Sequence, residues 1–285
     1  MSANALDSRP VAIPATLIRP SRGWSALNLR ELWRYRELIY FLTWRDVKVR
    51  YKQTLFGAAW AILKPFLTMV IFYFVFDRLA SVPTDGYPGP IFYFSGLLPW
   101  VLFQEGVTKA GTSLVMGANL ITKVYFPRLA IPLASVVSGT VDFALAFVVL
   151  LGMMAFYKLE VTARLLAVPL FVLMGLITAL GVGLWLSAMN VTYRDVGHVT
   201  PFMVQAWMYA SPIVYSANLI TDPLVRSLYG LNPVVGVIQG FRWAILGGMT
   251  FPGVLILESV LVSFVLLWSG AMYFRRMERS FADIV

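Results

Sequence analysis

Cysteine is absent from the 285-residue sequence, and histidine occurs only once, as His198. A disulfide framework, thiol chemistry, a zinc site and a Cys–His nucleophile pair are therefore excluded. The sequence also lacks the G-x-x-x-x-G-K-[ST] motif that surrounds nucleotide phosphates, so it holds no P-loop. His198 begins an apolar segment, where a packing or interfacial role is favoured over a ligand role.

Charge is scarce as well. Asp, Glu, Lys and Arg make up 13% of the residues, against roughly a quarter in soluble domains. Hydrophobic residues make up 59%, and the mean hydropathy is +0.75. This apolar content exceeds what one compact core can bury, which predicts an all-α integral membrane protein. The net charge of +9 does not indicate nucleic acid, because most cations lie outside the apolar runs, where membrane topology needs them.

The amino-terminal part divides into two predicted regions. Residues 1–28 are expected to form a disordered cytoplasmic leader, because the run VAIPATLI is broken by proline and no small-residue cleavage site follows it. Residues 29–53 lack proline and glycine and mix aromatic with basic side chains. They are expected to form an amphipathic helix at the membrane interface, bent or in two pieces.

Six apolar segments approach the roughly 20 residues that a helix needs to cross a bilayer. They cover residues 55–76, 91–118, 131–157, 165–190, 199–215 and 252–274. The predicted six-span domain covers residues 54–276, and residues 277–285 are its cytoplasmic tail. Between the last two spans, residues 228–248 are apolar but interrupted by glycine and proline, which predicts a re-entrant pair of half-helices.

The distribution of cations predicts the orientation. With the amino terminus inside, sixteen of the 23 Lys and Arg residues fall on inner segments and five on outer segments. The remaining two, Lys64 and Lys109, lie within spans. Six spans with both termini in the cytoplasm give this excess.

Glu105, Lys109, Asp142 and Glu258 lie within the predicted membrane segments, where charged side chains need partners or water. Glu105 and Lys109 are four residues apart on one helix, so they are expected to pair. Asp142 is expected to pair with a basic residue on another helix, and Glu258 to lie near the outer interface. These groups do not form a chain across the bilayer, as a proton relay would require.

Several stretches together resemble the permease subunits of polysaccharide exporters of the ABC-2 type, which export O-antigen, capsule or teichoic acid. They are RDVKVRYKQTLFGAAWAILKP, FYFSGLLPW, LITKVYFPR, YRDV and LNP, in this order. The most specific signature is R-D-x-K-x-R-Y-x-x-x-x-L/F-G-x-x-W before the first span. The resemblance covers nearly everything from residue 29 to residue 276.

The resemblance implies a homodimer in the bacterial inner membrane, each half bound to a separate P-loop ATPase that holds ATP and magnesium. The chain itself would be no enzyme and would need no cofactor. A channel at the dimer interface would pass a lipid-linked polysaccharide, with O-antigen favoured over capsule and teichoic acid.

Residue roles follow from the same resemblance. Contacts that couple the chain to the ATPase are expected at Leu120, Ile121, Tyr125, Phe126, Arg128, Tyr193, Arg194 and Asp195. A channel entrance that attracts the lipid pyrophosphate is expected at Arg45, Arg50 and Tyr51, with ordinary anchoring to the inner face as the alternative. Channel-lining aromatic residues are expected at Trp60, Tyr73, Trp100, Trp207, Tyr209 and Tyr215, with an interfacial belt as the alternative. Gate residues are expected at Asn232 and Pro233.

Three other classes of function remain open. A small-molecule exporter of the same type shares the plan of spans, although FYFSGLLPW and the basic aromatic helix argue against it. A membrane-embedded glycan enzyme would need acids or bases in exposed loops, and the outer loops offer Asp85, Asp222 and little else. A secondary carrier is disfavoured by the few membrane charges and the lack of a visible repeat.

Overall fold

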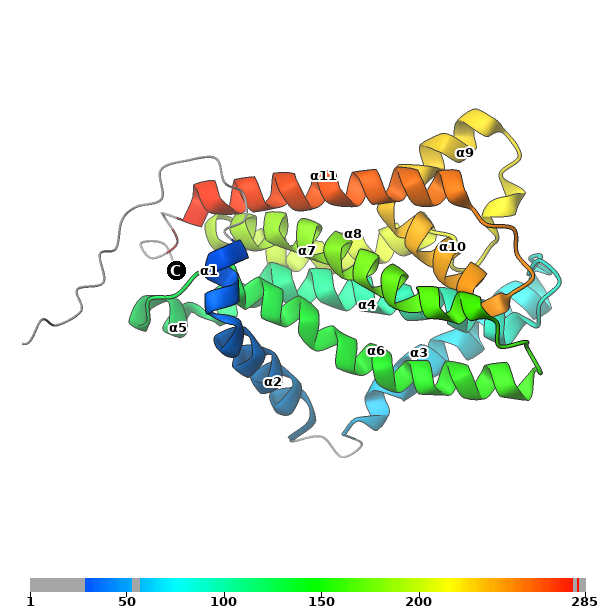
Figure 1. Cartoon of the computed structure of the whole chain (residues 1–285), viewed down its shortest axis with the longest axis horizontal. Helices are drawn as coiled ribbons and strands as arrows, with labels where there is room; N and C mark the ends of the chain where they lie inside the picture. The colour runs from blue at the N-terminus through cyan, green and yellow to red at the C-terminus, as the bar shows by residue number, and fades with distance from the viewer. Residues whose placement is uncertain (1–28, 53–56, 279–280, 282–285) are drawn as a thin grey trace, which may run out of the picture.

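The computed structural model describes residues 29–52, 57–278 and 281, and every regular element in these residues is helical. The predicted all-α class is therefore confirmed. The predicted leader, the first residues of the first span and most of the carboxy-terminal tail lie outside the described residues. Figure 1 shows the longer helices running side by side in one elongated bundle.

Eleven α-helices have assigned bounds in this part of the chain. They are α1 (Leu29–Arg34), α2 (Arg36–Lys52), α3 (Ala59–Phe72), α4 (Gly89–Met116), α5 (Ala118–Lys123), α6 (Ala130–Phe156), α7 (Val168–Thr192), α8 (Asp195–Tyr209), α9 (Pro223–Gly230), α10 (Pro233–Leu246) and α11 (Gly253–Met277). A π-helical segment, Tyr73–Leu79, continues α3, and short 3₁₀ segments, Ala163–Ala167 and Ala217–Leu219, lie before α7 and α9.

Four helical segments are long and apolar enough to cross a membrane: Ala59–Leu79, Ala130–Phe156, Ala163–Thr192 and Gly253–Met277. Two further predicted spans differ from this pattern. α4 has 28 residues but carries Glu105 and Lys109 in its second half. α8 has only 15 residues, fewer than a bilayer crossing needs, and irregular backbone follows it. The count of six spans therefore stays a prediction.

α4 is the central helix of the bundle. Every residue from Ile91 to Trp100 is buried, and α4 packs against α6, α7 and α10. The aromatic side chains of Phe92, Tyr93 and Phe94 therefore lie inside the helix packing. Burial on all sides explains why α4 has no single apolar stripe.

Helices α7 and α11 approach closely because glycine stands at their contact. A Cβ on Gly181 would lie 2.7 Å from the backbone nitrogen of Leu267, and one on Gly270 would lie 2.4 Å from the carbonyl oxygen of Gly181. The hydroxyls of Thr178 and Ser263 are 2.8 Å apart in the same contact. Small residues that let backbones approach are typical of helix contacts in membranes.

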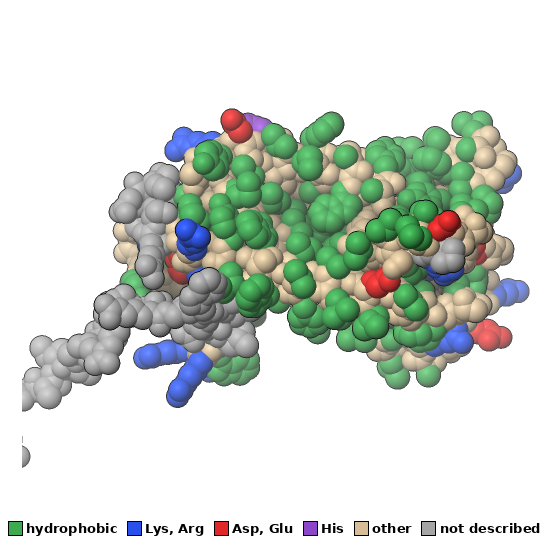
Figure 2. All heavy atoms as spheres, turned by 90° about the horizontal axis from the view of Figure 1, so that it is seen from above, with side chains coloured by type: hydrophobic (Ala, Val, Ile, Leu, Met, Phe, Trp, Pro, Cys, Tyr) green, Lys and Arg blue, Asp and Glu red, His purple; other side chains and the backbone are tan. Residues whose placement is uncertain are grey.

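The two ends of the bundle differ from its middle. α1, α5 and the last turn of α11 lie at one end, which we call the α5 end, and α9 lies at the other, the α9 end (Figure 1). Figure 2 shows hydrophobic side chains over the middle of one long face, with charged side chains gathered toward both ends. This distribution matches a bundle surrounded by hydrocarbon at its middle.

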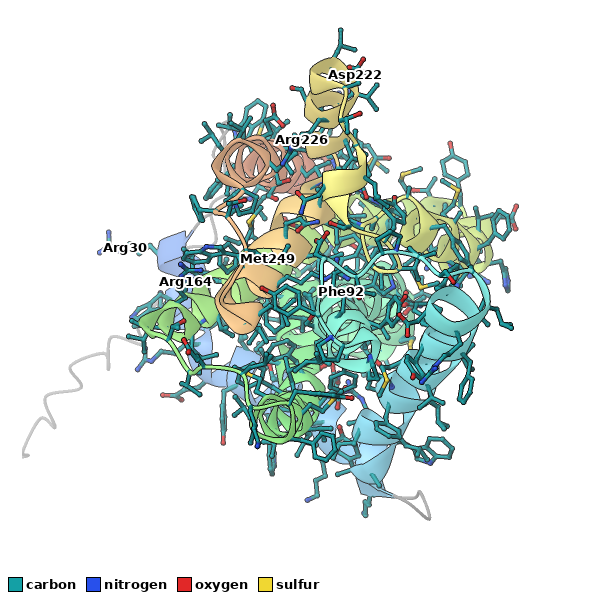
Figure 3. The ribbon with its side chains drawn as sticks, turned by 90° about the vertical axis from the view of Figure 1, so that its right-hand side faces the viewer. Arg30, Phe92, Arg164, Asp222, Arg226 and Met249 are labelled. Carbon is teal, nitrogen blue, oxygen red and sulfur yellow. The ribbon has the colours of Figure 1, made fainter. Side chains whose placement is uncertain are left out.

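At the α9 end, an arginine side chain holds a loop, and an aspartate caps a helix. Arg164 donates to the carbonyl oxygen of Gly247, and its guanidinium lies 5.2 Å from the ring of Trp243. Figure 3 shows Arg164 beside Met249, while Asp222, the residue before α9, and Arg226, within α9, lie in a part that stands out from the rest. The Asp222 carboxylate caps α9 by accepting from the backbone nitrogens of residues 224 and 225.

The interrupted segment at 228–248 contains the end of α9, a break, and all of α10. Asn232 caps α10 by accepting from the backbone nitrogen of Val234, and Gly247, with φ of 77°, ends the helix. The predicted break is present. The re-entrant path stays a prediction.

A buried arginine on α10 holds the irregular segment that follows α8. Arg242 has no exposed surface. Its guanidinium donates to the carbonyl oxygens of Pro212 at 2.6 Å, Ile213 at 2.7 Å and Phe92 at 3.2 Å, and lies 3.8 Å from the Phe92 ring centroid. Non-helical carbonyls inside a membrane protein need such internal donors, because lipid supplies none.

We predict that Arg242→Met destabilises the protein. The substitution leaves buried carbonyl oxygens without a hydrogen-bond donor. This loss outweighs the desolvation energy that is saved when a cation is no longer buried, so the free energy of unfolding should fall by about 2 kcal/mol. Thermal unfolding of the purified protein in detergent measures this as a lower midpoint. Arg226→Met on exposed α9 is the matched control and should leave the midpoint unchanged. Equal midpoints for the two variants would contradict the proposed role.

Candidate functional site

Helix α2 lies along α6 with most of its surface uncovered. Leu42 and Val47 are its buried residues, whereas Tyr40, Phe41 and Trp44 are more than half exposed. Figure 1 shows α2 running from the α5 end toward the middle of the bundle. Exposed aromatic residues on a basic helix suit the headgroup level of a membrane.

The last turn of α2 is fixed to α6 by Asp142. Arg50 and Tyr51 both donate to the Asp142 carboxylate, and the Arg50 guanidinium also donates to the Ser138 hydroxyl at 3.1 Å. The predicted basic partner of Asp142 is therefore Arg50. Burial lowers the pKa of Arg50 from its ordinary value, and the carboxylates of Glu105 and Asp46 oppose that shift.

Two more helices join this contact through charged side chains. Lys109 on α4 donates to Glu105, as the four-residue spacing predicts, and its ammonium lies 3.6 Å from Asp142. The Lys64 ammonium on α3 lies 3.9 Å from the other oxygen of Glu105. We call Arg50, Lys64, Glu105, Lys109 and Asp142 the charge cluster. It joins α2, α3, α4 and α6 and carries three cations and two anions.

A cavity of about 200 Å³ lies against the charge cluster. Arg50, Lys64, Glu105 and Asp142 contribute to its wall, and the rest of the wall is mainly apolar. Its apolar lining includes Trp60 and Pro65 of α3, Leu98 and Val101 of α4, and Phe143 and Ala146 of α6. The side chain of Lys64 is 64% exposed, so the cavity reaches the protein surface there.

The three residues predicted for the channel entrance separate into two groups. Arg50 and Tyr51 lie together at Asp142 and line the cavity. Arg45 instead pairs with Asp46 at 2.9 Å on the exposed side of α2. Five residues turn a helix by about 140° beyond one full turn, which explains why Arg45 and Arg50 face different surroundings. Their role at an entrance stays a prediction.

The predicted channel-lining residues are dispersed through the bundle. Trp60 lines the cavity, Tyr209 is exposed, and the Tyr73 hydroxyl accepts from Arg78 at 2.7 Å. Trp100 is buried and donates to Gln104 at 3.0 Å. Trp207 donates to Asn232 at 2.9 Å, and the Tyr215 hydroxyl lies 2.9 Å from that of Tyr229. Tyr73, Trp100, Trp207 and Tyr215 thus bond to other side chains within one protomer. The assignment of all six residues to a channel stays a prediction.

The predicted gate residues start α10. Asn232 accepts from Trp207 and donates to the carbonyl oxygen of Ala210 and the hydroxyl of Ser211, both at 3.1 Å. Pro233 is the first residue of α10 and is buried. Asn232 therefore ties α10 to the end of α8. A motion of either helix must break or carry these bonds.

The first predicted coupling loop presents one large aromatic side chain to solvent. Tyr125 is 69% exposed, whereas Ile121 and Phe126 are buried in a cluster with Leu42 of α2. Leu120 packs against the same cluster. Arg128 donates to the carbonyl oxygen of Glu278 and lies 6.0 Å from the ring of Phe281. Phe126 and Arg128 therefore hold the loop, and Tyr125 faces outward from it.

The second predicted coupling loop lies at the α5 end, where α7 ends and α8 begins. Tyr193, Arg194 and Asp195 are all exposed. Buried Asn190 holds the loop in place, because its amide donates to the Gly111 carbonyl at 3.0 Å and accepts from the Gly197 backbone nitrogen at 2.9 Å. Sequence reasoning missed Asn190. Its only signal is an amide side chain at the end of a long apolar run.

The described residues contain no group of three His, Asp or Glu side chains placed to hold a metal ion. The charge cluster is held together by ion pairs and hydrogen bonds. An array of cations and carboxylates beside an apolar cavity can bind, orient or release a charged amphiphile.

Comparison with known proteins gives a consistent result. Residues 37–246 match the family described as ABC-2 type transporter. The chain is 31% identical over 259 residues to a protein from Myxococcus xanthus named O-antigen export system permease protein RfbA, covering 90% of this chain and 98% of that protein. A protein of the same name from Klebsiella pneumoniae is 27% identical over 87% of this chain and 95% of its own length.

A more distant relative carries a different substrate in its name. The polysialic acid transport protein KpsM of Escherichia coli is 22% identical over 83% of this chain and 92% of its own length. The family match alone covers well over half of the chain. The chain therefore belongs to the ABC-2 type transporter family.

Proposed function

We propose that the chain is the membrane-spanning permease subunit of an ATP-driven exporter that moves a lipid-linked polysaccharide of the O-antigen class across the bacterial inner membrane. The observation that carries the proposal is the 31% identity to an O-antigen export permease over almost the full length of both chains. Transport of capsular polysaccharide is the second candidate, supported by the similarity to the polysialic acid transport protein.

Energy must come from outside this chain, because the sequence holds no P-loop. We assign two copies of a P-loop ATPase, with ATP and magnesium, to a homodimer of the permease. The outward-facing Tyr125 and the exposed loop at 193–195 support an ATPase contact at the α5 end. Buried residues hold both loops against the bundle, so the loops can transmit a motion of the ATPase to the helices.

We assign six spans with both termini in the cytoplasm. Four spans are the long apolar helices, and α4 and α8 supply the other two. α8 together with the irregular residues 210–216 covers 22 residues, enough to cross a bilayer if Arg242 and Asn232 satisfy the carbonyls of the irregular part. This arrangement places the α5 end in the cytoplasm.

Affinity purification in mild detergent from the native host tests the energy source. We expect a P-loop ATPase to co-purify at one copy per permease, and deletion of the permease to leave lipid-linked glycan inside the cell. Composition of the retained glycan separates O-antigen from capsule. Repeated isolation without any ATPase would contradict the coupling and favour an embedded enzyme or a carrier.

The absence of cysteine makes the span count directly measurable. We predict that Thr192→Cys, at the end of α7, reacts only with reagents on the cytoplasmic side and that Thr221→Cys, before α9, reacts only from outside. Val148→Cys, exposed in the middle of α6, should stay unlabelled because it faces hydrocarbon. Labelling of both threonine positions from the same side would overturn the fifth span.

Tyr125→Ala tests the coupling surface without disturbing the loop beneath it. Loss of one exposed aromatic contact should weaken ATPase binding by about tenfold or more and lower export in proportion. Quantitative co-purification and export of labelled glycan measure the two effects. Tyr40→Ala, equally exposed on α2, is the control and should retain ATPase. Normal ATPase retention and export by Tyr125→Ala would exclude this contact.

A further inference from the structure

We propose that the end of α11 is a clamp that positions the first predicted coupling loop, with Phe281 as its buried anchor and Arg128 as its polar tie. We call Arg128, Phe274, Glu278 and Phe281 the α11 clamp. The proposal rests on the ATPase contact that the proposed function gives to Tyr125. It changes the role of Arg128, which the sequence predicts to meet the ATPase, because Arg128 here acts only through the loop.

Phe281 is buried although it lies beyond the last residue of α11. Its side chain has no exposed surface, and its ring centroid lies 5.3 Å from that of Phe274, with the two planes at 76°. Edge-to-face pairs of this kind are a favoured arrangement of aromatic rings. A spacing of seven residues is about two helical turns, which places side chains on one face. Phe281 is therefore packed onto the same side as the last turns of α11.

The apolar cluster that holds Phe281 also holds the buried residues of the loop. Ile121 and Phe126 belong to it, together with Leu42 of α2 and Ala188 of α7. The one helix of the loop, α5, has only six residues, too few to be stable without packing. The position of the loop therefore depends on this shared cluster.

Arg128 joins the loop to the end of α11 by polar contacts. Its guanidinium donates to the carbonyl oxygen of Glu278, and its backbone nitrogen donates to the Glu278 carboxylate at 3.4 Å. The same guanidinium lies 6.0 Å from the centroid of the Phe281 ring. The last carbonyls of a helix have no partner within it and favour a nearby cation. One side chain therefore links the loop, the end of α11 and the buried anchor.

The loop divides into an exposed part and a held part. Tyr125 is 69% exposed and Val124 is 53% exposed, whereas Phe281 is fully buried. A fully buried side chain cannot contact another protein unless it leaves its packing. Its effect on a partner must therefore pass through the arrangement of the exposed residues. The α11 clamp sets the fraction of permease molecules whose loop is ready to dock.

This role has a measurable signature. When the binding-competent arrangement is only partly populated, the apparent Kd rises in inverse proportion to its population. If loss of the clamp lowers that population to about a tenth, the ATPase binds about tenfold more weakly. Binding also draws the loop back to the competent arrangement, so saturating ATPase restores its order. Loss of the Tyr125 contact differs, because it removes binding energy itself.

Spin labels on the cysteine-free chain test the clamp in the permease alone. Val124→Cys carries a nitroxide on the exposed part of the loop, and Thr192→Cys carries a reference label at the exposed end of α7. We expect Phe281→Ala to change the Val124 spectrum in detergent from mainly immobilised to mainly mobile, with the Thr192 spectrum unchanged. Phe281→Leu should keep the loop immobilised, because it retains much of the apolar volume.

A second variant tests the clamp without opening the apolar cluster. Arg128→Gln should also increase the mobile fraction at Val124, and it decides the question if Phe281→Ala does not fold. Arg128→Lys should restore order, since its ammonium can donate to the same carbonyl oxygen. Combining Arg128→Gln with Phe281→Ala should add less than the sum of the two effects, because both open one clamp. Phe264→Ala, exposed on α11, is the matched truncation and should change neither label.

Binding of the ATPase that co-purifies with the permease is the second measurement. We expect an approximately tenfold higher Kd for Phe281→Ala and Arg128→Gln, and an immobilised Val124 label at saturating ATPase. An unchanged Val124 spectrum in Arg128→Gln and in folded Phe281→Ala would overturn the clamp, as would equal changes at Val124 and Thr192. A mobile loop that binds the ATPase with unchanged Kd would overturn its role in docking.

The clamp and the transport function fail separately. The label spectra need no ATPase, so the clamp is measured even if no ATPase co-purifies, a result that contradicts only the proposed function. An unchanged label spectrum contradicts only the clamp and leaves the ATPase contact of Tyr125 intact.

Discussion

The carboxylate of Asp142 is the contact on which the arrangement of four helices depends. It accepts from Arg50 and Tyr51 of α2 and lies 3.6 Å from Lys109 of α4, whose partner Glu105 faces Lys64 of α3. Each of these charges would be costly in an apolar bundle by itself. Together they neutralise most of one another, and this sharing fixes the position of α2 beside α6. The three cations outnumber the two carboxylates by one, so the cluster keeps one positive charge in excess.

A second constraint acts on the backbone. Lipid offers no hydrogen bonds, so every break in a helix must be satisfied by the protein. Arg242 does this for the carbonyls after α8, Asn232 for those between α8 and α10, and Asn190 for the turn between α7 and α8. These three side chains lie where helices end inside the packing. They allow irregular backbone within the bundle without unpaired carbonyl oxygens at these positions.

The sequence predicts local features of this structure well and tertiary ones incompletely. The pairing of Glu105 with Lys109 follows from their spacing on one helix, and the break before Pro233 follows from Asn and Pro chemistry. The partner of Asp142 was predictable only as some base on another helix, because its identity depends on how α2 lies against α6. Trp100 carries no sequence signal that distinguishes a buried aromatic from one on a channel wall.

The basic stretch before the first apolar run shows how one segment serves two environments. Arg45 and Arg50 belong to the same basic stretch of the sequence. Because the helix rotates between them, Arg45 forms an exposed ion pair with Asp46, whereas Arg50 belongs to the charge cluster. Exposed Lys48 and Lys52 can meet lipid headgroups, while Arg50 joins the wall of the cavity. A single helix therefore marks the membrane surface on one side and supplies charge to an internal site on the other.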